Sequence, residues 1–525
     1  MTLSIRNTDS ITVGVNTSIS GVGDSLYLLP GVLLASTTSA AIVVTAEEVS
    51  LQIDGIVLAE DRGISAVVGT ARVTVGAQGS VVSMNSASAE VGILLDNGGN
   101  ILVNRGQITA PEAVAVFLRG GNNEAFNSGS ISGSTGVQLS TGVSDELINH
   151  GDILGTGSFD GVIEAFEGRG VLVQGSEASV YNGIGGFIGS TAPGGTGVLA
   201  GSGATGTRIE NLGEIAATDG IGIDFSPMGG FFGGNLSNSG IVSGKFTAVE
   251  GGNGIDVVVN SGVFVGDVVL NGGDDAYRAS GDGIVLRGGV FGDDGNDTLR
   301  GGESSDVFSG GADNDLLSGG GGSDSLDGGS GNDLLMGGFG DDRLDGGDGT
   351  DTLTGGDGED DLRGGTGSDL MKGGAGDDTL DGEDGLDTLR GGSGDDLLVG
   401  GRGRDVLFGG SGDDTLISGR DQDMLTGGDG KDVFVFTSTF DTGMDSKRDI
   451  ITDFERGKDL IDLSEIGSGL TFSASGVLGG GQASVFATVT GGGIRVRIDR
   501  DGDGIVDGQL QLEGLTGFAA NDLIL

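Results

Sequence analysis

From residue 292 to residue 435 the pattern of apolar and polar positions repeats every nine residues, sixteen times without an insertion or deletion. Each unit follows Gly-Gly-x-Gly-x-Asp-x-Leu-x, as residues 328–336 and 337–345 show. The eighth position is always large and apolar, and the sixth is always Asp. The pattern predicts a short strand around the eighth residue, whose side chain turns inward while its two neighbours face water. The glycines predict a tight turn, because they adopt positive φ without a penalty.

Two such units predict one full coil of a flat parallel roll. Stacked coils bring the sixth-position carboxylate and the turn carbonyls of one unit beside those of the unit two further on, which makes an all-oxygen cage for a hard cation. We expect Ca²⁺ rather than Mg²⁺, because Mg²⁺ requires near-octahedral geometry and keeps its water. The predicted metal ligands are Asp297, Asp306, Asp315, Asp324, Asp333, Asp342, Asp351, Asp360, Asp369, Asp378, Asp387, Asp396, Asp405, Asp414, Asp423 and Asp432.

These sixteen units resemble the RTX, or hemolysin-type, calcium-binding repeats of proteins exported by type I secretion. The resemblance implies several Ca²⁺ ions as cofactors, the type I secretion machinery as a partner, and an extracellular location. A few turns depart from the pattern: Ser304, Asp313 and Asp421 replace the fourth glycine, Asp293 and Glu383 the second, and Ser418 the first. A disordered acidic tail is the alternative, but disorder does not require an apolar residue in strict phase.

A looser repeat, Asn-x-Gly-x-apolar, runs from about residue 49 to residue 270 and predicts the coils of a parallel β-helix. We expect its asparagines to stack as an amide ladder at the turns, with a degenerate rung at Asn182. The clear copies begin at Asn104, Asn127, Asn149, Asn211, Asn238 and Asn260. A Gly followed by Val or Ile is predicted to start a further strand in each coil, at residues 136–137, 170–171, 197–198, 220–221 and 254–255.

This N-terminal half resembles the passenger region of bacterial autotransporter adhesins. Parallel β-helices also host polysaccharide lyases and epimerases, so a carbohydrate-active enzyme with an RTX secretion module is the alternative. The chain has one His, three Tyr and no Trp, which is a poor supply of acid/base groups and sugar platforms. It lacks the His-Glu-x-x-His and Gly-x-Ser-x-Gly motifs. His150 occupies the variable place of an Asn-x-Gly turn, where an ordinary turn residue is expected. We therefore predict no catalytic and no other cofactor-binding residue, although carboxylates that come together only in the fold keep an enzyme possible.

After the last repeat, residues 449–464 and 497–515 are similar to the C-terminal domain that follows the RTX roll in serralysins. Such a segment is expected to close the open end of the roll with strand partners and an apolar lid. Within it, Asp499, Asp501, Asp503 and Asp507 have the 1, 3, 5, 9 spacing of an EF-hand-like loop, but the twelfth place holds Leu510 rather than Glu. One further calcium site and a plain acidic hairpin turn are the two interpretations. Residues 522–525 resemble an uncleaved type I secretion signal or, alternatively, form an ordinary last strand.

Composition adds three limits. Cysteine is absent from the 525 residues, which excludes disulfides and thiolate metal sites. A net charge of −51 disfavours nucleic acid and anionic membranes as partners and requires positive counter-charge. No apolar run is long enough to cross a bilayer, and the first residues do not form a removable signal peptide.

The sequence thus predicts an all-β protein: a parallel β-helix over residues 1–270, an RTX parallel β-roll over residues 271–435, and a C-terminal β cap with the secretion signal over residues 436–525. The predicted function is that of a secreted calcium-binding protein whose roll folds on Ca²⁺ outside the cell. An adhesin, a matrix protein or a surface-layer protein that contacts a cell-surface glycan or a host surface fits this pattern.

Overall fold

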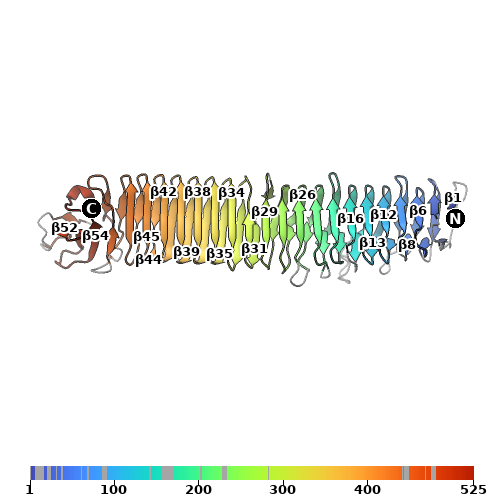
Figure 1. Ribbon diagram of the computed structural model, residues 1–525, viewed down its shortest axis with the longest axis horizontal. Coiled ribbons are helices and arrows are strands. Elements are labelled where there is room, and N and C mark those ends of the chain that lie inside the picture. The colour runs from blue at the N-terminus through green and yellow to red at the C-terminus, as the bar shows by residue number, and fades with distance from the viewer. Residues whose placement is uncertain are drawn as a thin grey trace. The chain divides into compact units, whose positions relative to one another are not determined.

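The computed structural model describes residues 2–5, 17–19, 25–30, 32–36, 40–60, 62–67, 70–84, 91–140, 144–156, 169–201, 204–227, 233–281, 283–439, 442, 448–467, 469–473 and 481–525. Two compact units divide the chain, an N-terminal unit (Met1–Asp294) and a C-terminal unit (Gly295–Leu525). The regular elements of the described residues are strands, apart from one 3₁₀ turn, η2 (Ala520–Asp522) (Figure 1). The all-β prediction is confirmed, whereas the three-part division of the chain stays a prediction. No helix in the described ranges is long and apolar enough to span a membrane.

The N-terminal unit is a parallel β-helix, because each strand pairs in parallel with its counterpart one coil away. Each coil contributes strands to three columns. The first column holds β1 (Thr2–Ile5), β3 (Ser25–Leu28), β6 (Ser50–Ile53), β9 (Arg72–Val75), β12 (Ile101–Asn104), β14 (Glu124–Asn127), β16 (Glu146–Asn149), β19 (Ser179–Asn182), β22 (Arg208–Asn211), β25 (Asn235–Asn238), β27 (Val257–Asn260) and β29 (Ala276–Ala279).

The other two columns follow the turn in each coil, and four long strands, β13, β15, β26 and β28, extend through both of them. The second column holds β4 (Leu33–Ser36), β7 (Ile56–Ala59), β10 (Ser80–Ser83), β13 (Gln107–Arg119), β15 (Ser130–Ser140), β17 (Asp152–Gly155), β20 (Phe187–Pro193), β23 (Glu214–Asp219), β26 (Ile241–Glu250), β28 (Val263–Val269) and β30 (Ile284–Leu286). The third adds β2 (Thr17–Ile19), β5 (Ile42–Val44), β8 (Ile64–Ala66), β11 (Val91–Leu95), β18 (Arg169–Val173), β21 (Thr196–Ala200), β24 (Ile223–Asp224) and β31 (Val290–Asp294).

The asparagine ladder is confirmed, and Asn182 belongs to it. The side-chain Nδ2 of Asn104 donates to Oδ1 of Asn127 at 2.7 Å, and Asn127 donates in the same way to Asn149 at 2.7 Å. The series continues through Asn182, Asn211, Asn238 and Asn260 at 2.8–2.9 Å. All seven side chains are 0–2% exposed. Each side-chain amide therefore hydrogen-bonds to its neighbour inside the core, where an unpaired polar group would destabilise the fold.

The expected Gly-Val and Gly-Ile strand starts are only partly confirmed. Residues 136–137, 170–171 and 197–198 lie in β15, β18 and β21, but residues 220–221 and 254–255 lie outside strands. In the first of these two coils the strand begins at Ile223, which pairs with Val198. The prediction selected the wrong dipeptide there because Gly222-Ile223 follows directly with the same pattern.

The C-terminal unit begins with a roll of two columns, in which each strand pairs in parallel with the strand eighteen residues further on. The first column holds β32 (Thr298–Arg300), β34 (Leu316–Gly321), β36 (Leu334–Phe339), β38 (Thr352–Asp357), β40 (Leu370–Ala375), β42 (Thr388–Ser393), β45 (Val406–Ser411) and β47 (Met424–Asp429). The second holds β33 (Val307–Ala312), β35 (Ser325–Gly331), β37 (Arg343–Gly349), β39 (Asp361–Gly367), β41 (Thr379–Gly385), β43 (Leu397–Val399), β44 (Arg402–Gly403), β46 (Thr415–Ile417) and β48 (Val433–Val435).

The two-unit coil and the inward eighth residue are confirmed, since Leu317 and Leu335 pair across coils and are fully buried. Most strands are longer than the predicted three residues, because they continue into the first glycines of the next unit. Positive φ occurs at the second and fourth glycines, such as Gly338 (φ 122°) and Gly340 (φ 108°). Asp293, Asp313, Glu383 and Asp421 adopt positive φ of 65–81° where they replace these glycines. Each such side chain strains its turn.

The segment after the last repeat gives the final coils strand partners, as expected. β49 (Asp449–Ile451) pairs in parallel with β47, and β50 (Leu460–Asp462) pairs in parallel with β48. The rest of the segment forms the strands β51 (Thr471–Phe472), β52 (Ser484–Thr490), β53 (Gly493–Asp499), β54 (Gly508–Glu513) and β55 (Leu523–Ile524). Of these, β52, β53 and β54 make an antiparallel meander, and β54 returns to pair with β49.

Candidate metal centre

The sixth-position aspartates of the roll form two ladders, one for each column of strands. From Asp297 to Asp414, the backbone N–H of each aspartate donates to Oδ1 of the aspartate eighteen residues later, as from Asp315 to Asp333 at 2.7 Å and from Asp360 to Asp378 at 2.9 Å. All sixteen side chains are 0–4% exposed. The repeat therefore buries a continuous double row of carboxylates beside the turns, on both edges of the roll.

The second carboxylate oxygen of most of these aspartates is buried without a protein donor. Among the described residues, Oδ2 has no hydrogen-bond partner in thirteen of them: Asp315, Asp324, Asp333, Asp342, Asp351, Asp360, Asp369, Asp378, Asp387, Asp396, Asp405, Asp414 and Asp432. Asp306 differs, because its Oδ2 accepts the N–H of Gly302 at 3.0 Å. A buried anionic oxygen without a donor is strongly destabilising unless a cation compensates it.

The first glycine of each unit makes room for that oxygen. A Cβ added to Gly346 would lie 2.7 Å from Oδ2 of Asp351 and 2.6 Å from the carbonyl oxygen of Gly364 in the next coil. Gly328 has the same relation to Asp333, at 2.6 Å. Glycine is needed here for close approach rather than for positive φ, which occurs at the second and fourth positions. The carboxylate and the turn carbonyls consequently share one small space.

Burial perturbs these carboxyl groups in the absence of a cation. Desolvation, together with the charges of neighbouring aspartates, raises the pKa of Asp315, Asp378 and Asp414 to about 7, against the lowering effect of the backbone hydrogen bond. Desolvation likewise raises the pKa of Asp333 and Asp369 to about 6. A divalent ion removes this penalty by supplying the missing positive charge.

The donor set fits Ca²⁺. It consists of carboxylate and carbonyl oxygens with no nitrogen or sulfur ligand, and hard cations prefer such oxygens. The thirteen Oδ2 atoms that have no protein donor are the atoms that would coordinate such an ion. The residues predicted from the nine-residue spacing are thus brought together in the fold, and their role as ligands is taken up below as a proposal.

Two further aspartates continue the ladders beyond the last repeat, and the sequence prediction missed both. The N–H of Asp423 donates to Oδ1 of Asp449 at 2.9 Å, and the N–H of Asp432 donates to Oδ1 of Asp459 at 3.2 Å. Residues 449–451 and 459–461 keep the Asp-x-apolar spacing of the repeats, and this spacing could have identified the two aspartates from the sequence. It was missed because the glycines that mark a repeat are absent there.

The EF-hand-like spacing is realised only in part. Carboxylate oxygens of Asp499, Asp501 and Asp507 lie within 4.8 Å of one another. Asp499 is fully buried, and its two oxygens accept the N–H groups of Gly502 at 2.7 Å and Gly504 at 3.0 Å. Asp503, the fourth predicted ligand, is exposed and accepts the N–H of Ile505 at 2.7 Å, outside the group of three.

Comparison with known proteins identifies the roll. A family described as the RTX calcium-binding nonapeptide repeat matches residues 291–326, 327–362, 354–389, 363–398, 390–425, 399–434 and 408–442. The C-terminal region therefore carries RTX calcium-binding repeats. A matching solved structure is the solution structure of a subunit from the Azotobacter vinelandii mannuronan C5-epimerase, at 26% identity over 35% of this chain and 78% of that chain, with a TM-score of 0.16. No curated protein matches the chain.

Proposed function

We propose that this protein is secreted by the type I route and that its roll folds when Ca²⁺ binds outside the cell. In this proposal the sixth-position aspartates are the ligands, and Asp499, Asp501 and Asp507 hold one further ion. The observation that supports it is the double row of buried carboxylates, in which the second oxygen of thirteen aspartates has no protein donor among the described residues. RTX repeats are typical of secreted proteins, which supports the extracellular location.

Charge supports the coupling of folding to calcium. The chain carries 77 acidic and 26 basic residues, so the calcium-free roll concentrates negative charge without a counter-ion. Binding energy for the folded state then becomes folding energy by mass action. In cytosol, where calcium is scarce, the roll remains expanded and suited to export, and at extracellular calcium it folds.

The proposed biological role is attachment, as a surface-associated adhesin, matrix or surface-layer protein. The N-terminal unit supports this role because it is a repetitive scaffold whose core is held by an amide ladder. Its outward strand faces offer a large regular surface. A repetitive β-helix is well suited to present such a surface.

Calcium titration of the full chain, followed by circular dichroism, tests the folding proposal. A cooperative gain of β signal as calcium approaches millimolar levels is expected. A chain that is fully folded in chelator would contradict it. Attachment of cells that display the chain is measured in the same buffers, and unchanged attachment in chelator would contradict the attachment role separately.

A carbohydrate-active enzyme is the second candidate, because the carboxylates of Glu146 and Glu210 line one hollow of the N-terminal unit. Glycan cleavage uses such pairs as acid and base or nucleophile. Incubation with acidic glycans in calcium, followed by analysis for new reducing or unsaturated ends, separates the two candidates. We expect intact glycan; turnover that is lost in Glu146→Gln and in Glu210→Gln would favour the enzyme.

A further inference from the structure

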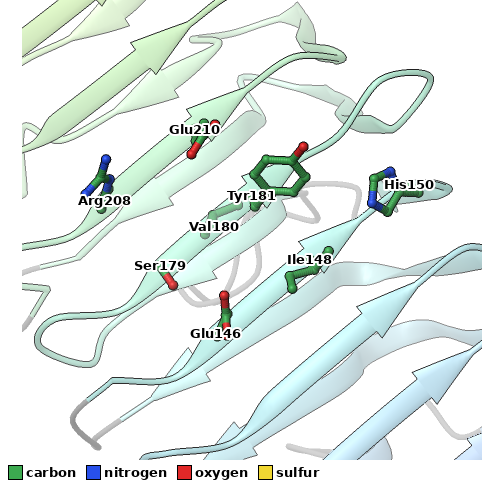
Figure 2. A pocket seen from close by; sticks show the side chains of 8 residues that line it. All are labelled: Glu146, Ile148, His150, Ser179, Val180, Tyr181, Arg208 and Glu210. Carbon is green, nitrogen blue, oxygen red and sulfur yellow. The ribbon is translucent and has the colours of Figure 1, made fainter.

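Three hollows adjoin one another on the outer face of the first strand column of the N-terminal unit. The middle hollow, of about 500 Å³, is lined by side chains that project from β16, β19 and β22 (Figure 2). A second hollow, of about 490 Å³, shares Ile148 and His150 with it and extends to Arg72 on β9. A third, of about 420 Å³, shares Arg208 and extends to Val257 on β27. Together they form one groove, the outer groove.

The outer groove crosses eight successive strands, from β9 to β27. Neighbouring strands lie about 4.8 Å apart, so the groove is roughly 30 Å long. This length suits an extended polymer rather than a small molecule. The strands beneath it are paired on both sides, as β16 is with β14 and β19, so the groove offers no free edge for the backbone of a peptide strand. Recognition must therefore come from the outward side chains.

A row of mostly apolar side chains, the apolar ridge, runs along the bottom of the groove. Val103, Phe126, Ile148 and Tyr181 occupy the same outward position in consecutive coils and are in direct register. In the coils on either side, Thr74 and Glu210 hold this position. Phe126 and Tyr181 stand on strands that are two spacings apart, about 10 Å, which is a length that spans about two pyranose rings. His150 packs edge-on against Tyr181, with ring centroids 5.8 Å apart.

The charges around the Phe126 end of this ridge favour an anionic ligand. Arg72 and Arg105 line the hollow that contains Phe126, and no carboxylate lines that hollow. Within the described part of the chain, no acidic group lies within salt-bridge distance of Arg72, Arg105 or Arg208. In a chain of net charge −51, three exposed guanidinium groups without acidic partners on one groove are available for a ligand's carboxylates.

The middle hollow differs, because Glu146 and Glu210 line it together with Arg208. These carboxylates accept hydrogen bonds from hydroxyl or amide groups and repel a ligand that is negative at every unit. A ligand that fits both hollows therefore places a charged unit beside a neutral one, as an alternating polymer does.

We propose that the outer groove binds a linear polysaccharide in which carboxylate-bearing sugars alternate with neutral ones. Pyranose rings stack on Phe126 and Tyr181, Arg72 and Arg105 hold sugar carboxylates, and Glu146 and Glu210 bind hydroxyls of the neutral sugars. This inference names the ligand class for the attachment role and rests on that proposed function. An acidic peptide has the charge but lacks regularly spaced flat rings for the ridge.

Isothermal titration of the full chain in saturating calcium tests the inference. The probe is a hyaluronan octasaccharide, which alternates uronate and N-acetylated sugars, and its carboxyl methyl ester is the matched uncharged probe. The test variant is Arg72→Gln with Arg105→Gln. The control is Arg278→Gln, which removes an exposed arginine from β29 on the same column, outside the three hollows.

We expect the double variant and the methyl ester each to weaken binding by at least about tenfold, and the control to bind as the native chain does. Equal binding by the double variant, or by the ester, would overturn the inference. Tighter binding of an oligoglutamate with the same number of carboxylates would also overturn it, in favour of a peptide. Calcium-dependent attachment that persists in the double variant would remove the groove from the attachment role while leaving that role intact.

Discussion

The backbone N–H of Asp432, in the last repeat, donates a hydrogen bond to Oδ1 of Asp459, which lies in the segment that follows the roll. The other oxygen of Asp459 accepts the N–H of Glu455 at 2.6 Å. Asp459 thus continues the ladder of the repeats, but protein donors engage both of its oxygens. This ladder therefore ends on a carboxylate whose two oxygens both accept backbone N–H groups of the protein.

Replacement of Asp459 by Ala should weaken this end of the ladder. The buried N–H of Asp432 would lose its acceptor, so we expect the free energy of unfolding in saturating calcium to fall by about 1–3 kcal/mol. Denaturant unfolding measures it. Glu465→Ala, an exposed acidic residue of the same segment, is the control and should change stability little. Equal stability of the Asp459 variant and the control would contradict this stabilising role.

Replacement of Asp369 by Asn should abolish calcium binding at this position while the ladder of hydrogen bonds is kept. The amide oxygen still accepts the N–H of Asp351, which donates at 2.8 Å in the native chain, but the anionic Oδ2 is lost. We expect the number of calcium ions bound per chain, measured by calorimetry, to fall by about one or two. Asp357→Asn makes the same charge change at an exposed third position and should leave this number unchanged.

The calcium-free roll should gain structure as the pH falls. The pKa of Asp378 and Asp414 is raised to about 7 in the folded state, above the ordinary value of 3.8. The folded state thus binds protons more tightly than the unfolded state, so this stabilising contribution is complete below about pH 4 and is lost as the pH rises through about 7. Circular dichroism in calcium-depleted buffer should show more β signal at pH 5.5 than at pH 8. A larger β signal at pH 8 would contradict this sign.

Calcium affinity should follow the opposite course. Because the ion needs the deprotonated carboxylates, protons compete with it as the pH falls through about 7. We expect the calcium concentration at half-saturation to rise between pH 8 and pH 6, and saturating calcium to restore the same β signal at both pH values. An affinity that does not depend on pH in this range would show that the buried aspartates are not the ligands.

The four aspartates of the acidic loop between β53 and β54 should differ in their effect on calcium binding. Asp501→Asn should remove about one bound ion, because Asp501 belongs to the cluster with Asp499 and Asp507. Asp503→Asn should remove none, because its carboxylate lies outside the cluster. Terbium luminescence of the full chain measures the difference. Equal loss in both variants would support the spacing-based prediction over the geometry.

Replacement of an asparagine inside the ladder should destabilise the N-terminal unit. Asn182→Ala removes the side-chain N–H that the Oδ1 of Asn211 accepts inside the core, and it removes one of the three acceptors of the Nδ2 of Asn149. We expect the free energy of unfolding of the N-terminal unit to fall by about 1–3 kcal/mol, measured by denaturant unfolding in calcium. Asn235→Ala, at an exposed position of β25, is the matched control and should change it little.

The sequence by itself determined the features that depend on strictly periodic residues. The sixth-position Asp and the eighth-position apolar residue recur at one spacing, so the coil length, the buried row and the carboxylate ladders follow from local geometry repeated sixteen times. The asparagine ladder followed from a local motif, Asn-x-Gly-x-apolar, rather than from a fixed spacing, since Asn149 and Asn182 are 33 residues apart.

Other features were decided only by the tertiary structure, because their residues come from coils of different length that stack on one another. Asp449 and Asp459 join the ladders without the glycines that mark a repeat, and Asp503 turns away from a loop whose spacing includes it. The outer groove combines Arg72, Phe126 and Arg208, which belong to coils separated by loops of different length. Side chains of this kind carry no shared period, so their proximity depends on strand register, which the sequence expresses only through the complete fold.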